Sequence, residues 1–121
     1  MQYESIEERR SEIRPGVTFV VARISFGRRL ELMRRVRELA PKLEYCEAGN
    51  TTGDRIEANL LSAEIDRLYI EWGLREIRGL EIDGAPANPT TLVDAGPEDL
   101  CREALQFVKR ASGLSESEAK N

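Results

Sequence analysis

The chain has 121 residues, of which 40% are hydrophobic and 33% charged, and its net charge is −4. These values are typical of one small soluble domain, and no apolar run approaches the roughly 18 residues that span a bilayer. The first residues alternate acidic and basic side chains, which excludes a signal peptide. Histidine is absent, so Ser-His and Cys-His catalytic pairs are excluded within this chain.

The N-terminal third predicts a polar segment, a strand and a helix. Residues 1–15 are polar and end at the turn sequence RPG, so we expect a flexible N-terminal segment there. Residues 17–25 are rich in β-branched side chains and predict a strand covered on at least one face. Ser25 is placed to cap a helix that Pro41 breaks or ends. The apolar side chains of this helix share one broad arc, which comprises Phe26, Leu32, Met33, Val36 and Leu39.

The most informative predicted element is a helix over 55–74, which Asp54 is expected to cap after a loop at 50–53. Its apolar side chains form two stripes. The first comprises Leu61, Ile65, Leu68, Tyr69 and Trp72. The second lies nearly opposite and comprises Ile56, Leu60, Ala63, Ile70 and Leu74. A surface helix needs only one apolar stripe, so this helix is either sandwiched inside the domain or shared with a second chain.

The two stripes are expected to differ in burial. The first is the tighter and carries the only Trp, so we expect it to pack inside the monomer. The second includes Arg67 within its arc, and a charged side chain is rarely fully buried unless it is paired. We therefore expect the second stripe to be less buried and to bind a partner, either a second copy or another protein. The candidate partner-binding residues are Ile56, Leu60, Ala63, Ile70 and Leu74.

Residues 74–87 predict a short β-hairpin or extended segment. Asp83-Gly84 is a common turn pair, because glycine accepts a positive φ and aspartate bonds its own backbone. Glu81, Asp83 and Asp94 could offer oxygens to Ca²⁺ or Mg²⁺, but a calcium loop needs more ligands at fixed alternate positions. A structural turn is therefore favoured, and no catalytic, cofactor-binding or metal-binding residue is predicted.

The C-terminal part predicts a third main helix from Pro97, with Gly113 just past its end. Its core face is expected to comprise Leu100, Ala104, Phe107, Val108 and Ala111. Residues 114–121 contain Ser115 and Glu118 at capping-box spacing, and we expect a disordered tail or a chain that continues in a longer product. The predicted fold is α+β and mostly α: N-terminal strand or strands, three main helices and a hairpin around 74–87, in one domain over 16–113.

Charge is unevenly distributed: residues 1–42 carry ten Lys or Arg and six Asp or Glu, whereas residues 43–121 carry eight and sixteen. Such polarity can drive head-to-tail association or attract a charged partner, although two solvated faces are the simpler interpretation. Nucleic-acid binding by the arginines of the first helix is not favoured, because Glu31 and Glu38 are spaced to pair with them and no aromatic side chain is interleaved. The isolated Cys46 and Cys101 indicate inert cytosolic thiols, with one disulfide as the alternative.

Five segments in their order resemble the small tail assembly chaperones of phages and prophages. They are SFGRRLELMRRVREL, LYIEWGL, GLEIDGAPA, GPEDLCREAL and LSESEAKN. The resemblance covers most of the chain after about Gly16. Its most specific parts are Trp72-Gly73, the turn 79–87, Gly96-Pro97-Glu98 and the closing Lys120-Asn121.

The resemblance implies a non-enzymatic protein of the bacterial host cytoplasm. Such a protein binds the tape-measure protein, keeps its long hydrophobic helices soluble, and helps the tail-tube protein to polymerise around it. No cofactor, membrane or nucleic-acid partner is expected, and a homo-oligomer is compatible with the two-striped helix. The alternative from another class is a structural neck or tail-completion protein that is retained in the virion.

Overall fold

The structure is a computed structural model that describes residues 1–113. Its elements are β1 (Ile6–Arg10), β2 (Thr18–Ala22), α1 (Phe26–Glu47), α2 (Thr52–Gly73), β3 (Leu74–Arg78), β4 (Glu81–Ile82), β5 (Ala85–Pro86), α3 (Pro89–Ala95) and α4 (Glu98–Ser112). The predicted α+β, mostly α class is confirmed, with α1, α2 and α4 as the main helices. The short helix α3 was not predicted, and the expected tail at 114–121 lies outside the described residues.

The strands β1, β2 and β3 form an antiparallel sheet in that order. β1 pairs with β2 over its whole length, from Ile6 opposite Ala22 to Arg10 opposite Thr18. Part of the segment 1–15, which was expected to be flexible and outside the domain, therefore belongs to the sheet. The strand β1 was not predicted because its side chains are mostly charged. An edge strand with a solvent-exposed face needs few apolar residues.

β2 is buried on both faces, which explains why its apolar side chains follow one another without strict alternation. Phe19 and Val21 belong to the main core. Val20 points to the other face, where its neighbours in register are Glu8 and Glu76. Arg78 bonds both of these carboxylates, so Val20 lies beneath an ion-pair network that shields it from water.

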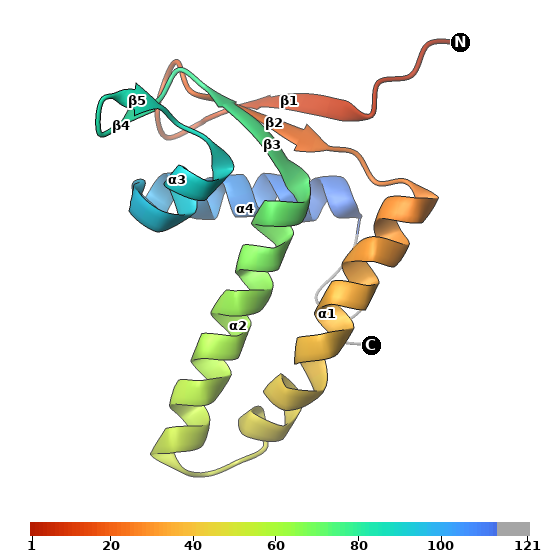
Figure 1. Cartoon of the computed structure of the whole chain (residues 1–121), viewed down its shortest axis with the longest axis vertical. Helices are drawn as coiled ribbons and strands as arrows, with labels where there is room; N and C mark the ends of the chain where they lie inside the picture. The colour runs from red at the N-terminus through yellow and green to blue at the C-terminus, as the bar shows by residue number, and fades with distance from the viewer. Residues whose placement is uncertain (114–121) are drawn as a thin grey trace.

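The helices form a hairpin and a crossing layer (Figure 1). α1 and α2 run side by side and antiparallel, and the hairpin projects away from the sheet, while α4 crosses beneath the sheet near the upper end of α2. The main core lies where the sheet, α4, α3 and the upper ends of α1 and α2 meet. A second cluster of Leu43, Cys46 and Leu61 holds the far end of the hairpin together.

Helix boundaries agree with the sequence at some positions and differ at others. Ser25 caps α1 as predicted, by accepting a hydrogen bond from the backbone N–H of Arg28. Pro41, however, neither breaks nor ends α1, which continues to Glu47. The turn after Pro41 buries Leu43 and Cys46 against α2, and this packing offsets the lost backbone hydrogen bond.

The start of α2 also needs a correction. The capping residue is Thr51, whose side chain accepts a hydrogen bond from the N–H of Asp54 at 3.0 Å. Asp54 lies at the third helical position and accepts in return from the N–H of Thr51. The Asp that was expected to be the cap is therefore the second half of a capping box, and α2 begins three residues earlier than the predicted helix.

Candidate partner-binding surface

The inward stripe of α2 packs inside the monomer, as predicted. Leu61, Tyr69 and Trp72 are buried, and Ile65 and Leu68 are half-buried. Trp72 is further tied to α1, because its indole N–H donates to the carbonyl oxygen of Arg28 at 3.2 Å. The Arg28 guanidinium in turn donates to the carbonyl oxygen of Trp72 and lies 4.9 Å from the centre of its ring. Burial, followed by the charge of Arg75, lowers the pKa of Arg28.

The opposite stripe of α2, the outer stripe, divides into two halves. Near the loop that joins α1 to α2, Ile56 is 63% exposed, Leu60 is 52% exposed and Ala63 is also exposed, as expected. Ile70 and Leu74 are each only 3% exposed and belong to the main core. The expectation that the whole stripe is less buried is therefore wrong for Ile70 and Leu74. The candidate surface reduces to Ile56, Leu60 and Ala63, which we call the distal stripe.

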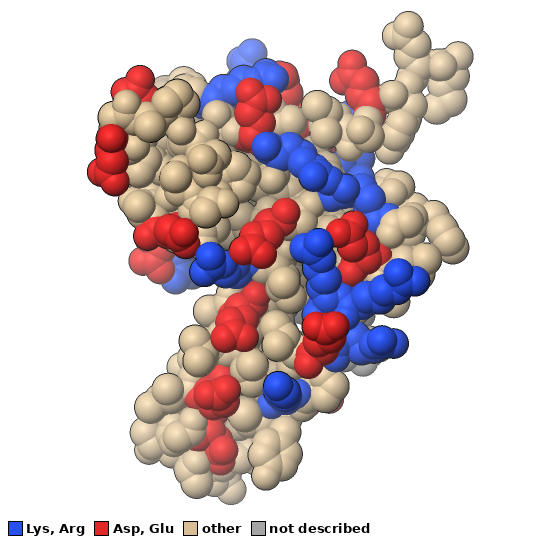
Figure 2. All heavy atoms as spheres, viewed as in Figure 1, with Lys and Arg blue, Asp and Glu red and all other residues tan. Residues whose placement is uncertain are grey.

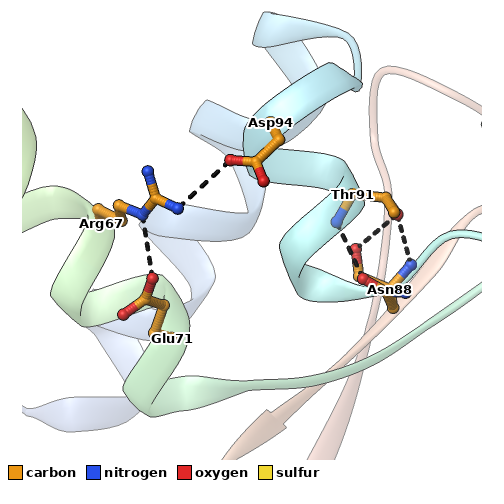
Figure 3. Close-up of polar contacts among 5 residues, drawn as sticks. All are labelled: Arg67, Glu71, Asn88, Thr91 and Asp94. Carbon is orange, nitrogen blue, oxygen red and sulfur yellow. Dashed lines mark hydrogen bonds and ion pairs between the residues drawn. The ribbon is translucent and has the colours of Figure 1, made fainter.

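Helix α3 lies beside the upper part of α2, and its first turn is stabilised by its own capping box (Figure 3). The side-chain oxygen of Asn88 accepts from the N–H of Thr91, and the Thr91 hydroxyl oxygen accepts from the N–H of Asn88, each at 2.9 Å. Leu92 then anchors α3 in the core with no exposed surface. Asn followed by Pro89 is a helix-start signal, so the sequence held information that could have predicted α3.

Arg67 marks the boundary between the covered and the open half (Figure 3). Its guanidinium donates to Glu71, one turn further along α2, at 3.0 Å. It also reaches Asp94 near the end of α3 at 3.3 Å. These two carboxylates raise the pKa of Arg67, chiefly through the hydrogen bond that Arg67 donates to Glu71. The charged residue that suggested a less buried stripe is thus paired at the surface, and it closes the edge of the core.

The far end of the hairpin also carries a shallow groove of about 350 Å³ between the two helices. Its lining residues are Pro41, Lys42, Tyr45, Cys46, Glu57 and Leu61. Tyr45 is largely exposed beside it. Burial, followed by the nearby charges of Glu57 and Asp54, raises the pKa of the Cys46 thiol. The groove therefore lies at the same end of the hairpin as the distal stripe, and Glu57 is the acidic residue in its lining.

A second exposed apolar stripe lies on α1. Phe26 is 83% exposed, and Leu30 and Met33 are also exposed. The broad apolar arc identified in the sequence is therefore divided: Leu32 and Val36 are buried, whereas Phe26 and Met33 are exposed. The reason is that α1 meets α2 along a narrow seam, so that side chains at the edge of the arc remain in solvent. We call Phe26, Leu30 and Met33 the α1 stripe.

Charge separates along the hairpin (Figure 2). Acidic side chains follow α2 in this view, and basic side chains gather over the upper part of α1. The acidic residues of α2 are Asp54, Glu57, Glu64, Asp66 and Glu71. The basic residues of α1 are Arg28, Arg29, Arg34, Arg35, Arg37 and Lys42. Of the ion pairs expected on α1, Glu31 with Arg35 is formed at 2.9 Å.

The remaining candidate sites carry no chemistry beyond structure. Asp83 and Gly84 both have a positive φ between the paired strands β4 and β5, which confirms the predicted turn. Asp94 is ion-paired with Arg67 and does not belong to this turn. Within residues 1–113 no group of three or more potential ligand side chains could hold a metal ion. Cys46 and Cys101 are free thiols, so the disulfide alternative is wrong, and burial raises the pKa of Cys101 also.

No helix within the described part of the chain is long and apolar enough to cross a membrane. Comparisons of the chain with family models, with curated proteins and with solved structures each returned no match. The resemblance to tail assembly chaperones therefore rests on the sequence segments alone.

Proposed function

We propose that this protein is a non-enzymatic tail assembly chaperone of a phage or prophage, which binds the tape-measure protein in the host cytoplasm and assists assembly of the tail tube. The observation that carries the proposal is the distal stripe: three apolar side chains remain exposed on a helix whose inward stripe is buried or half-buried inside the monomer. They lie on a hairpin that projects from the body of the fold (Figure 1).

The physical properties of this surface suit a protein that holds apolar helices in solution. An amphipathic helix binds by placing apolar side chains at i, i+3, i+4 and i+7 against a matching apolar face. The distal stripe and the adjoining groove offer such a face without requiring the core to open. The acidic residues of α2 beside it keep the free protein soluble and limit non-specific aggregation.

Co-expression with a tape-measure protein tests the proposal. We expect the wild-type chain to move the tape-measure protein into the soluble fraction and to co-purify with it. Leu60→Asp should abolish both effects, because it places a charge in the middle of the distal stripe. Ile13→Asp places the same charge at another exposed aliphatic residue, away from the hairpin, and serves as the control. Unchanged solubility of the tape-measure protein with wild-type chain would reject the chaperone function.

Mass spectrometry of purified particles separates this function from its alternative. A chaperone leaves before the particle is complete, so we expect the chain to be absent from mature virions. A stoichiometric amount in the particle would instead identify a neck or tail-completion component. The two results cannot both hold, and neither depends on how the distal stripe is interpreted.

A further inference from the structure

The hairpin carries two exposed apolar stripes with the same spacing. The α1 stripe occupies positions 26, 30 and 33, and the distal stripe occupies positions 56, 60 and 63. Each therefore follows the i, i+4, i+7 pattern by which one helix packs on another. The two stripes cannot meet within one molecule, because α1 and α2 already face each other through Leu43, Cys46 and Leu61.

The charges beside the two stripes have opposite signs. Arg29, Arg34 and Arg37 surround the α1 stripe, and none of them forms an ion pair within residues 1–113. Glu57 and Glu64 lie two turns apart along one edge of the distal stripe, and neither is ion-paired in the described chain. Each apolar stripe is therefore bordered by charges that have no ion-pair partner within residues 1–113.

We propose that the α1 stripe of one copy packs on the distal stripe of a second copy. This arrangement brings the arginines beside Leu30 against Glu57 and Glu64 while both apolar stripes leave water. Pairing two distal stripes would place Glu57 and Glu64 near the same glutamates of the other copy, and pairing two α1 stripes would oppose arginines. Charge thus selects the unlike pair over both symmetric ones.

An unlike pair leaves one stripe of each kind free at the ends of the dimer, so further copies add until a ring closes or a filament grows. The contact has only three apolar side chains on each copy, so we expect it to be smaller than the roughly 1,200 Å² that stable interfaces bury in total. We therefore expect weak association that depends on protein concentration and is reduced by salt. The inference goes beyond the proposed function and needs no tape-measure protein, so either can fail without the other.

Sedimentation velocity of the full chain over a wide concentration range tests the proposal. The wild-type weight-average mass should rise with concentration at low salt and fall in high salt. Glu57→Lys with Glu64→Lys makes both stripes basic, and Arg34→Glu with Arg37→Glu makes both acidic. Each double variant alone should lose at least tenfold in association constant. An equimolar mixture of the two should regain association, because every basic stripe then finds an acidic one.

Controls separate a specific contact from a change in net charge or fold. Glu4→Lys with Glu81→Lys shifts the net charge by the same amount away from the hairpin and should associate like the wild type. Circular dichroism checks each variant, and the single variants Glu64→Lys and Arg37→Glu replace any double variant that unfolds. A wild-type chain that remains monomeric overturns the proposal. So does a mixture that fails to regain association, or an Arg34→Glu, Arg37→Glu variant that associates as the wild type does.

Discussion

The outer stripe of the predicted helix runs from Ile56 to Leu74, yet its two ends lie in opposite environments. Ile70, near the end of α2, and Leu74, the first residue of β3, are buried in the main core, whereas Ile56 and Leu60 are exposed. The difference comes from the elements that pack on the upper part of α2, which are α4, α3 and the sheet. An apolar stripe therefore indicates that some segment must pack on the helix, but the rest of the chain decides which part of the stripe is covered.

The largest expected effect is at the covered end. Trp72→Ala should cost about 3–5 kcal/mol, a large share of the 5–15 kcal/mol that stabilises a typical domain. It removes a buried side chain, its hydrogen bond to Arg28 and the stacking of that guanidinium. Tyr45→Ala truncates an exposed aromatic side chain near the loop between α1 and α2 and should change stability by less than about 0.5 kcal/mol. Urea denaturation measures both, and equal losses would refute the contrast between the two ends.

The outer stripe itself gives the next test. Ile70→Ala should destabilise the fold by about 2–5 kcal/mol, because Ile70 is buried in the main core. Leu60→Ala, ten residues earlier on the same stripe, should remain within about 0.5 kcal/mol of the wild type. Thermal unfolding followed by circular dichroism compares the two variants. If Leu60→Ala were as costly as Ile70→Ala, the distal stripe would be covered in solution.

Two glycines at the ends of α2 sharpen the comparison further. A methyl group on Gly73 would overlap the side chain of Val108 on α4, so Gly73→Ala should cost about 1–3 kcal/mol. A methyl group on Gly53, in the first turn of α2, would make only an ordinary 3.8 Å contact with Thr51 Oγ1, so Gly53→Ala should stabilise the helix by about 0.4–1 kcal/mol. Chemical denaturation measures the change in unfolding free energy for both variants. A loss for Gly73→Ala with a gain for Gly53→Ala supports the difference between the two ends of α2, and two changes of the same sign would contradict it.

A smaller effect is expected at the boundary. Arg67→Ala and Asp94→Ala each remove an exposed contact between α2 and α3, so both should lower the melting temperature only slightly. Their coupling in a double-mutant cycle should shrink as salt is added, because exposed charges are screened. A large coupling that persists in high salt would show that this ion pair, and not burial of Leu92, holds α3 in place.

The smallest effect concerns the thiol of Cys46, near the loop between α1 and α2. Because burial and the charges of Glu57 and Asp54 raise its pKa, Cys46 should react with iodoacetamide more slowly than an unfolded thiol at neutral pH. Glu57→Gln removes one of those charges and should speed the reaction modestly. The unfolded chain loses this thiol proton first as pH rises, so stability should fall above about pH 8.5. Mass spectrometry after timed labelling measures the rate, and a slower Glu57→Gln variant would contradict the stated cause.

Much of the fold could be predicted because its signals are local. Ser25, the Asp83-Gly84 turn and Gly113 act through the backbone of their own segment, and all three lie where expected. The strand β1 and the passage of α1 through Pro41 were not predicted, because pairing with β2 and packing against α2 outweigh weak local preferences.

For the candidate site, the sequence alone determined that α2 has two apolar stripes and that the inward one, with Trp72, belongs to the core. Periodicity along a helix is enough for this, since a stripe with the larger side chains gains most from burial. Only the tertiary structure decided that Ile70 and Leu74 are buried while Ile56, Leu60 and Ala63 are exposed. The physical reason is that burial depends on which segments pack on a stripe, and α3, α4 and the sheet pack on the upper end of this one only.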